Sequence, residues 1–341
     1  MPNPIFEKKN VVVTGGAGFI GVQLCERLLK EAKVICIDDF SNSRPENISH
    51  LLQYSDFEFI NHDVNKPLDL EKIDELDKFK VKFQGIQEIY HLACPTSPKK
   101  FEQLRVANLV SNSVAVMNTL DIAVKYRAQY VFTSSVVVYG DDVDRRNTIK
   151  EGDIGAVNQL SARACYDEGK RFAETCIATY KMVYGIDAKI ARVFTTYGPH
   201  MPLFEGQLIP DFILNALEGK DLEIYGDENF ATSLCYVSDI VDGLVRLMST
   251  GPDISVVNLG GETAYKYKDV AEMIISMTGS TSQITYQPPL LFLSRKGTPD
   301  IAYAKEALGW FPLVRLEDGL QKTIDFVTAN KEALLFDGQS R

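Results

Sequence analysis

A tyrosine and a lysine stand four positions apart in the stretch CYDEGK, at Tyr166 and Lys170. On a helix this spacing places both side chains on one face, one turn apart. A lysine ammonium beside a phenol favours the phenolate, which lowers the tyrosine pKa and makes the residue a base for a hydroxyl group. Ordinary surface pairs on helices have the same spacing, so this interpretation needs support from other residues.

Ser135 is the third residue of this candidate catalytic group. It closes the apolar run YVFTSS, which predicts a buried strand, and its hydroxyl can share the tyrosine proton through a hydrogen bond. The next residues, Val136, Val137 and Val138, carry no group that moves a proton. The sequence therefore predicts a site without a carboxylate beside the serine, although the preference of buried strands for β-branched residues explains the valines equally well.

A glycine-rich turn indicates where a cofactor binds. Gly15, Gly18 and Gly21 follow the apolar run VVVTG and open a helical pattern. Such glycines let the backbone approach a pyrophosphate and aim helix N-terminal N–H groups at it. The next apolar run, KVICID, ends in Asp38 about 20 residues later, where a carboxylate accepts hydrogen bonds from a ribose and repels a 2′-phosphate. The pattern predicts NAD rather than NADP, and a glycine turn with a solvated aspartate is the alternative.

Further residues are assigned to the cofactor site. Asp63, which closes FINHDV, is expected at the adenine, although a solvated acid at a strand end explains it nearly as well. The other expected cofactor contacts are Phe19, Ile20, Val64, Leu92, Ala93 and Asn108, together with Tyr166 and Lys170.

Short strands and longer helices must alternate to position these residues. The strand patterns are VVVTG, KVICID, FEFINHDV, EIYHLA, YVFTSS and DAKIARVF, and helices are predicted at about 19–31, 108–126 and 165–184. This alternation predicts an α/β fold with a Rossmann-like, doubly wound parallel sheet.

The pattern changes after Gly198 and Pro199 to scattered helices and short strands that are richer in Pro and Gly. We therefore expect a smaller, interleaved C-terminal α/β substrate domain. Residues 1–194 are predicted to form the NAD-binding domain, and about 234–261 to return to it. Residues 195–233 and 262–336 are predicted to form the substrate domain.

The composition excludes several classes of partner. A net charge of -10 and a pI near 5.1, without a dense basic run, argue against nucleic acid. The first ten residues lack an apolar signal segment, and no later apolar run approaches the roughly 20 residues that span a bilayer, so we expect a cytoplasmic protein without membrane contact. The 6 cysteines form no C-x-x-C pair and the 4 histidines have no ligand spacing, which predicts no metal site.

The motifs GGAGFIG, Ser135 and YDEGK resemble the extended short-chain dehydrogenase/reductase family, in its NAD-dependent nucleotide-sugar epimerase/dehydratase branch. Similar stretches extend over nearly the whole chain: HLACPTSP, IARVFTTYGP, LEIYGD, YVSDIVDGLVRLM, NLGG and ALGWFP. Within that family, HLACPTSP and ACYDEGKR are especially similar to the UDP-glucuronate decarboxylases, which make UDP-xylose. The resemblance implies a bound NAD that oxidises C-4 of the sugar, catalysis by Tyr166, Lys170 and Ser135, and commonly a homodimer through a helix bundle.

The chain differs from these relatives at positions whose side chains determine which reaction the keto-sugar undergoes. The decarboxylases have a glutamate where this chain has Val137 and an arginine where it has Thr232. The 4,6-dehydratases have an Asp-Glu pair where it has Val136 and Val137. An asparagine that typically meets the diphosphate is replaced by Thr195. An arginine after the YGP turn is replaced by His200, which is expected at the cleft mouth, either at a substrate phosphate or in solvent.

Substrate contacts are expected from Pro95, Ser135, Tyr166, Thr195, Tyr225 and Arg295. Arg295 is the candidate to replace the cation missing at position 232, although a solvated loop charge explains it nearly as well.

Three functions remain open from the sequence. The first is UDP-glucuronate decarboxylation to UDP-xylose, because a β-keto acid formed at C-4 loses carbon dioxide comparatively easily. The second is 4-epimerisation of a UDP-sugar, which needs Ser135, Tyr166 and Lys170 but no carboxylate. The third is an NAD-binding homologue that has lost catalysis, against which the intact tyrosine and lysine argue. The departures leave the sugar and its nucleotide open.

Overall fold

The fold is built on a seven-stranded parallel sheet. The structure is a computed structural model, and it describes residues 8–140, 148–290 and 297–338. The strand order is β12-β7-β5-β4-β1-β2-β3, and all neighbours run parallel, which confirms the predicted doubly wound sheet. The strands span β1 Lys9–Thr14, β2 Ala32–Asp38, β3 Phe57–Asn61, β4 Glu88–His91, β5 Gln129–Ser135, β7 Ala188–Val193 and β12 Val256–Leu259.

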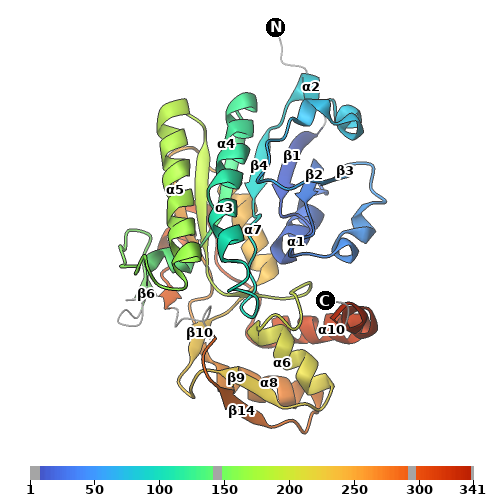
Figure 1. The fold of residues 1–341 in the computed structure, drawn as a ribbon, viewed down its shortest axis with the longest axis vertical. Coiled ribbons are helices and arrows are strands. Elements are labelled where there is room, and N and C mark those ends of the chain that lie inside the picture. The colour runs from blue at the N-terminus through green and yellow to red at the C-terminus, as the bar shows by residue number, and fades with distance from the viewer. Residues whose placement is uncertain (1–7, 141–147, 291–296, 339–341) are drawn as a thin grey trace.

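Both faces of this sheet are covered by helices. Successive side chains of β1 point to opposite faces: Val11 and Val13 join one hydrophobic cluster, and Val12 joins the other. Burial on both faces explains why these strands are continuous apolar runs. Helices α1 and α7 contact each other and pack on one face, whereas α3, α4 and α5 contact one another and form a second layer, which lies in front in Figure 1. These helices span α1 Phe19–Leu28, α3 Arg105–Ser111, α4 Val114–Tyr126, α5 Ala164–Tyr184 and α7 Val237–Met248.

The single helix predicted over 108–126 is two helices in the structure. Asn112 and Ser113 separate α3 from α4. The Ser113 hydroxyl donates to the Leu109 carbonyl at 2.6 Å, and the Asn112 amide donates to the Asn108 carbonyl at 2.9 Å. Side chains that bond back to helix carbonyls compete with the backbone ladder, which explains the break.

A second, smaller body follows β7 and lies below the sheet in Figure 1. Its strands form two-stranded pairs: β8 Thr196–Tyr197 with β11 Cys235–Tyr236, β9 Leu222–Tyr225 with β14 Ile284–Gln287, and β10 Ala231–Ser233 with β13 Ala264–Lys266. Its helices are α6 Leu208–Leu217, α8 Tyr267–Thr278 and α10 Leu316–Gly338. The remaining elements are η1 Pro45–Asn47, η2 Ser49–Leu51, η3 Leu70–Lys72, η4 Asp74–Phe79, α2 Val81–Gln84, η5 Val136–Tyr139, α9 Ala302–Leu308, and the pair β6 Thr148–Ile149 and β15 Thr298–Pro299. None of the described helices is both long and apolar enough to cross a membrane.

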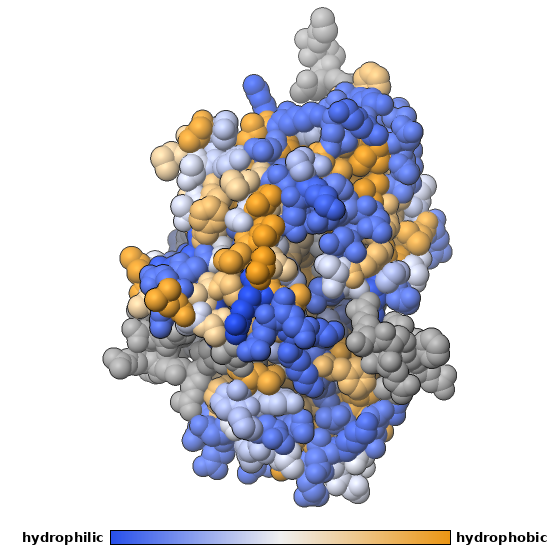
Figure 2. All heavy atoms as spheres, in the orientation of Figure 1, coloured by the Kyte–Doolittle hydropathy of each residue, from blue (hydrophilic) through white to orange (hydrophobic). Residues whose placement is uncertain are grey.

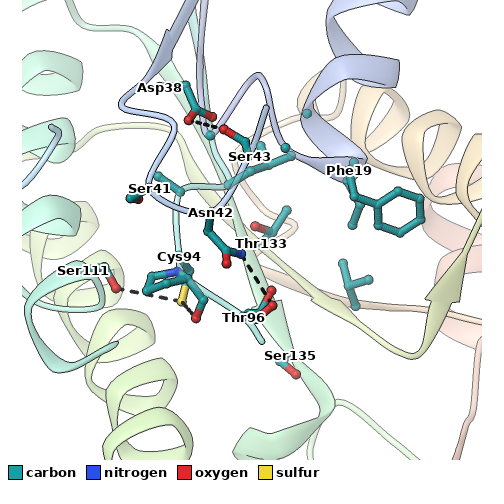
Figure 3. A pocket seen from close by; sticks show the side chains of 18 of the residues that line it. Phe19, Asp38, Ser41, Asn42, Ser43, Cys94, Thr96, Ser111, Thr133 and Ser135 are labelled. Carbon is teal, nitrogen blue, oxygen red and sulfur yellow. Dashed lines mark hydrogen bonds between the residues drawn. The ribbon is translucent and has the colours of Figure 1, made fainter. Parts of the chain in front are cut away.

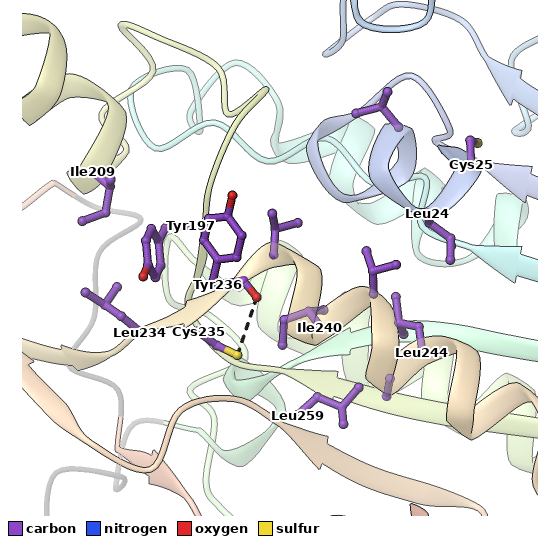
Figure 4. Packing of buried hydrophobic residues seen from close by; sticks show 14 of the residues in the cluster. Leu24, Cys25, Tyr197, Ile209, Leu234, Cys235, Tyr236, Ile240, Leu244 and Leu259 are labelled. Atoms are coloured by element: carbon purple, nitrogen blue, oxygen red, sulfur yellow. Dashed lines mark hydrogen bonds between the residues drawn. The ribbon is translucent and has the colours of Figure 1, made fainter. Parts of the chain in front are cut away.

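Helix α7 connects the two bodies through one continuous hydrophobic core. Its residues Ile240 and Leu244 are fully buried. In Figure 4 they lie between Leu24 of α1 and a group from the second body that includes Tyr197 and Ile209. The segment after β11 therefore returns to the sheet as α7 and β12. The domain boundaries at 194, 234 and 261 stay a prediction.

Replacing Leu244 by alanine is expected to lower the free energy of unfolding by about 2–5 kcal/mol, because it removes a fully buried side chain from this shared core and leaves a cavity. Urea unfolding measures the change. The control is Leu313→Ala, since Leu313 is 70% exposed and its replacement should change stability little. Equal effects of the two substitutions would contradict a core centred on α7.

Candidate active site

A cavity of about 320 Å³ lies at the carboxyl ends of the parallel strands, within the size range of small-molecule sites. Ligands bind at this edge in doubly wound folds because the strand ends and the helix N-termini gather there. Most of the predicted residues line it: Gly15, Gly18, Phe19, Ile20, Gly21, Asp38, Asp63, Val64, Leu92, Ala93, Pro95, Ser135, Tyr166, Lys170 and Thr195. In Figure 3, Asp38 and Ser43 lie far from Ser135 across this cavity.

At two positions of the glycine turn, the neighbouring backbone lies so close that a side chain would not fit. Gly15 has a φ of +69°, and a Cβ there would lie 2.8 Å from the Ala93 nitrogen. A Cβ on Gly21 would lie 2.1 Å from the Gly15 carbonyl oxygen. Gly18 stands at the N-cap of the ten-residue helix α1, and the N–H groups of the first turn of this helix are free to bind a ligand. This cradle fits a pyrophosphate.

Asp38 is held in a fixed orientation at the end of β2. Its carboxylate accepts hydrogen bonds from the Ala17 amide at 3.0 Å, the Phe40 amide at 2.9 Å and the Ser43 hydroxyl at 2.7 Å. Burial raises the pKa of Asp38, and these three hydrogen bonds lower it. Since an ionised carboxylate offers about four lone-pair sites, Asp38 retains acceptor capacity for a ribose hydroxyl. Together with the glycine cradle, it fits NAD.

Tyr166, Lys170 and Ser135 meet at the other end of the cavity. Lys170 is buried, donates to the Thr133 carbonyl at 3.0 Å, and lies 4.7 Å from the centre of the Phe132 ring. Its Nζ is 6.0 Å from the centre of the Tyr166 ring. The helix spacing therefore places both side chains beside the strand that carries Ser135.

The pKa of Tyr166 is raised in the structure, whereas the sequence predicts that it is lowered. Burial raises the pKa of Tyr166, whereas its hydrogen bond with Ser135 acts in the opposite direction. Burial also lowers the pKa of Lys170. The expected lowering depends on the charge of Lys170, whereas the loss of solvent around the buried phenol raises the pKa and dominates here.

The three valines after Ser135 are buried in apolar packing, and one of them contacts the candidate catalytic tyrosine. Val137 packs with Phe101 and Tyr166, while Val136 and Val138 join a separate buried cluster. The carboxylates among the described lining residues are Asp38, which ends β2, Asp39, which follows it, and Asp63, which comes after β3. In the described part of the site, the surroundings of Tyr166 therefore lack a cavity-lining carboxylate.

Two of the departures from the family contact each other. The hydroxyls of Thr195 and Thr232 are 2.8 Å apart, and Thr232 is buried. Thr195 lines the cavity and Thr232 lies behind it. A neutral pair of hydroxyls therefore occupies the place where the resemblance implies an asparagine and an arginine.

His200 is not among the described cavity-lining residues, although the following Met201 and Pro202 are, and its side chain is partly buried rather than solvated. Its Nδ1 is 3.2 Å from the Asn47 Oδ1, and its ring lies 4.5 Å from that of Phe326. Burial and the nearby His50 lower the pKa of His200 to about 4. Asn47 in turn donates to the Ala17 carbonyl at 2.8 Å, so His200 supports the glycine turn.

Three other predicted residues lie outside the main cavity or outside the described structure. Asn108 is fully buried behind Cys94, whose Sγ is 3.6 Å from the Asn108 Oδ1. Tyr225 lines a separate small cavity and donates to Glu223 at 2.9 Å. Arg295 falls outside the described residues.

Sequence reasoning missed several lining residues. Ser43 and Cys94 line the cavity, as do Met201, Pro202 and Gln207 from the second body. The run HLACPTSP contained a signal for Cys94, whereas nothing in the spacing indicated that the loop before α6 reaches the cavity. In the part of the chain that the structure describes, no group of three or more His, Cys, Asp or Glu side chains is placed to hold a metal ion.

Known proteins resemble this chain over most of its length. The family model for the NAD dependent epimerase/dehydratase family matches residues 11–260. The chain is 37% identical over 328 residues to UDP-glucuronic acid decarboxylase 1 of Danio rerio, covering 96% of this chain and 74% of that protein. It is 36% identical over 328 residues to UDP-glucuronic acid decarboxylase 6 of Arabidopsis thaliana, covering 94% of this chain and 91% of that protein.

A solved structure shares the whole fold. UDP-glucuronic acid 4-epimerase from Bacillus cereus, in complex with UDP-glucuronic acid and NAD, superposes with a TM-score of 0.81 at 26% identity, covering 94% of this chain and 99% of that one. The family match spans the glycine turn, Asp38 and the Ser135, Tyr166 and Lys170 group. The chain therefore belongs to the NAD dependent epimerase/dehydratase family, within the extended short-chain dehydrogenases/reductases: it is an enzyme, and NAD is its cofactor.

Proposed function

We propose that this enzyme is a UDP-glucuronate decarboxylase that oxidises C-4 of the sugar and yields UDP-xylose. The observation that carries the proposal is that Ser135, Tyr166 and Lys170 line the same cavity as the glycine turn and Asp38. This arrangement suits the oxidation of a hydroxyl beside a dinucleotide. The relatives named UDP-glucuronic acid decarboxylase, at 36% and 37% identity, support the choice of substrate.

Tyr166 takes the proton of the C-4 hydroxyl, and Ser135 orients that hydroxyl by a hydrogen bond. The Lys170 ammonium stabilises the phenolate that results from the earlier loss of the tyrosine proton. The glycine turn and Asp38 would hold NAD. When bound, NAD would accept the hydride from C-4, which makes C-4 a ketone, and its reduced form would later return a hydride to C-4. At the end of the cycle Tyr166 returns its proton to the C-4 oxygen.

The missing carboxylate at position 137 is compatible with this reaction. A ketone at C-4 makes the C-6 carboxylate a β-keto acid, so the bond between C-5 and C-6 breaks with its electron pair delocalised onto the C-4 oxygen. Carbon dioxide leaves, and C-5 takes a proton from solvent. The apolar contact of Val137 with Tyr166 and Phe101 leaves these steps without a carboxylate neighbour among the described lining residues.

The second candidate is 4-epimerisation of a UDP-sugar. The packing of Val137 against Tyr166 favours it, because epimerisation needs only the hydride chemistry and room for the keto-sugar to turn. The Bacillus cereus structure named UDP-glucuronic acid 4-epimerase has the same fold and supports this alternative.

A homodimer is also part of the proposal. Val106 and Leu109 on α3 are 71% and 49% exposed, and Phe172 on the neighbouring α5 is 48% exposed. Figure 2 shows hydrophobic residues gathered over α3. An exposed apolar surface of this kind is typical of an interaction site, and a second copy of the chain is the proposed partner. The cytoplasmic location stays a prediction.

Incubation of the purified protein with UDP-glucuronate, with and without added NAD, tests the reaction by mass spectrometry. Decarboxylation is expected to give a product lighter by carbon dioxide. An isomer of unchanged mass would support the 4-epimerase instead, and no conversion would contradict both.

In Tyr166→Phe, turnover should fall by about a hundredfold or more while NAD still binds, because only the acid–base hydroxyl is removed. The control Tyr54→Phe changes a tyrosine that is 51% exposed and should retain activity.

The rate is expected to rise with pH through the neutral range. Because burial raises the pKa of Tyr166, the phenolate fraction is small at neutral pH and grows as the pH increases. Because burial lowers the pKa of Lys170, the ammonium is lost on the alkaline side and the rise should level off there. Measurement of kcat/KM between about pH 6 and pH 9 tests this. A profile that falls with pH from the acid end would contradict the assignment.

Replacing both Leu109 and Phe172 by glutamate is expected to convert the dimer into a monomer, because the substitutions place two charges in an apolar interface. Light scattering should give about twice the chain mass of 38.1 kDa for the wild type and the single-chain mass for the variant. The control is Phe83→Glu, since Phe83 is 85% exposed on α2, away from this surface. A wild type of single-chain mass at working concentration would remove the dimer.

A further inference from the structure

Helix α5 is bound to the end of β5 at two adjacent points. The Lys170 ammonium donates to the Thr133 carbonyl at 3.0 Å, and the Ser134 hydroxyl donates to the Glu174 carboxylate at 2.6 Å. Lys170 and Glu174 are one helical turn apart, and Thr133 and Ser134 are consecutive on the strand. The two contacts therefore lie next to each other, immediately before Ser135.

The Glu174 carboxylate is fixed by a second group. Arg192 of β7 donates to it from Nε at 3.0 Å and from Nη2 at 2.7 Å, in a bidentate pair whose side chains are 14% and 13% exposed. Arg192 also donates to the Glu151 carbonyl at 2.8 Å and lies 4.7 Å from the Tyr139 ring centre. A bidentate pair restricts rotation of both groups, so the position of the carboxylate is determined by the sheet.

Among the residues that the structure describes, few charged or titratable groups influence the Lys170 ammonium. They are Tyr166 and Glu174 on its own helix, Cys94 after β4 and His91 on β4. His91 is buried, and burial together with the Lys170 charge lowers its pKa to about 3, so it adds no positive charge at neutral pH. Burial lowers the pKa of Lys170, while Cys94 and Glu174 raise it. Glu174 is the carboxylate among these four groups.

We propose that Glu174 is a positioning residue whose fixed carboxylate supports the buried ammonium of Lys170 and anchors the end of the strand that carries Ser135. Glu174 is absent from the described cavity lining, so it acts through Lys170 and Ser134 rather than on the substrate. The inference rests on the catalytic role proposed above for Lys170. It assigns a role to the largely buried ion pair of Glu174 and Arg192, which is bonded to Ser134, the residue before Ser135.

The test is a direct titration of Lys170 in the NAD-loaded protein. Lysine labelled with carbon-13 at Cε reports the loss of the ammonium proton by NMR, and Lys170→Arg assigns the resonance. In Glu174→Gln the titration midpoint is expected to fall by about one pH unit, because a nearby opposite charge is removed. The kcat should fall with KM little changed. An unchanged midpoint in folded Glu174→Gln would overturn the proposal.

The control is Glu168→Gln, which removes a carboxylate from the same helix. Glu168 pairs with Arg171 at 3.8 Å, its side chain is 34% exposed, and the midpoint of Lys170 should stay as in the wild type. If Glu174→Gln does not fold because Arg192 is left unpaired, Glu174→Met with Arg192→Met removes both charges, a change that proteins often tolerate. A lower midpoint in that pair supports the proposal, and an unchanged one rejects it. The titration needs no sugar, so it is independent of the mass-spectrometric result.

Discussion

The buried ammonium of Lys170 is the constraint on which the geometry of the proposed catalytic group depends. A charge away from water must be paired or hydrogen bonded, and Lys170 meets this requirement at the Thr133 carbonyl. This contact fixes α5 against the end of β5. It thereby determines the position of Tyr166, one turn before Lys170 on the helix, relative to Ser135, two residues after Thr133 on the strand. Because β5 is a central strand, flanked by β4 and β7, the position of the proposed catalytic group is determined by the rigid sheet rather than by a loop.

The sequence predicted the features that depend on local spacing. The glycines at 15, 18 and 21, Asp38 at a strand end, and Tyr166 with Lys170 on one helix face all lie at the cavity. Each of these rests on helix or strand periodicity over a few residues, together with the rule that parallel strands end at one edge.

The features that the sequence did not predict depend on contacts between distant segments. His200 meets Asn47, 153 positions away, and Thr195 meets Thr232, 37 positions away, so neither contact is visible in local spacing. The break between α3 and α4 arises from side-chain hydrogen bonds of Asn112 and Ser113, which compete with a strong helical pattern. The pKa of Tyr166 was misjudged because burial depends on the complete fold.

The shared core around α7 has a consequence for how this protein can be varied. The segment that contains α7 and β12 lies in the chain between parts of the second body, yet it packs on the sheet, and Leu244 belongs to the same cluster as Ile209 and Ile274. The two bodies are therefore not modular units. A chimera that exchanged the second body for that of a relative would cut through one core at several places, so new substrate specificity is more accessible by point substitution at the cavity than by recombination of whole domains.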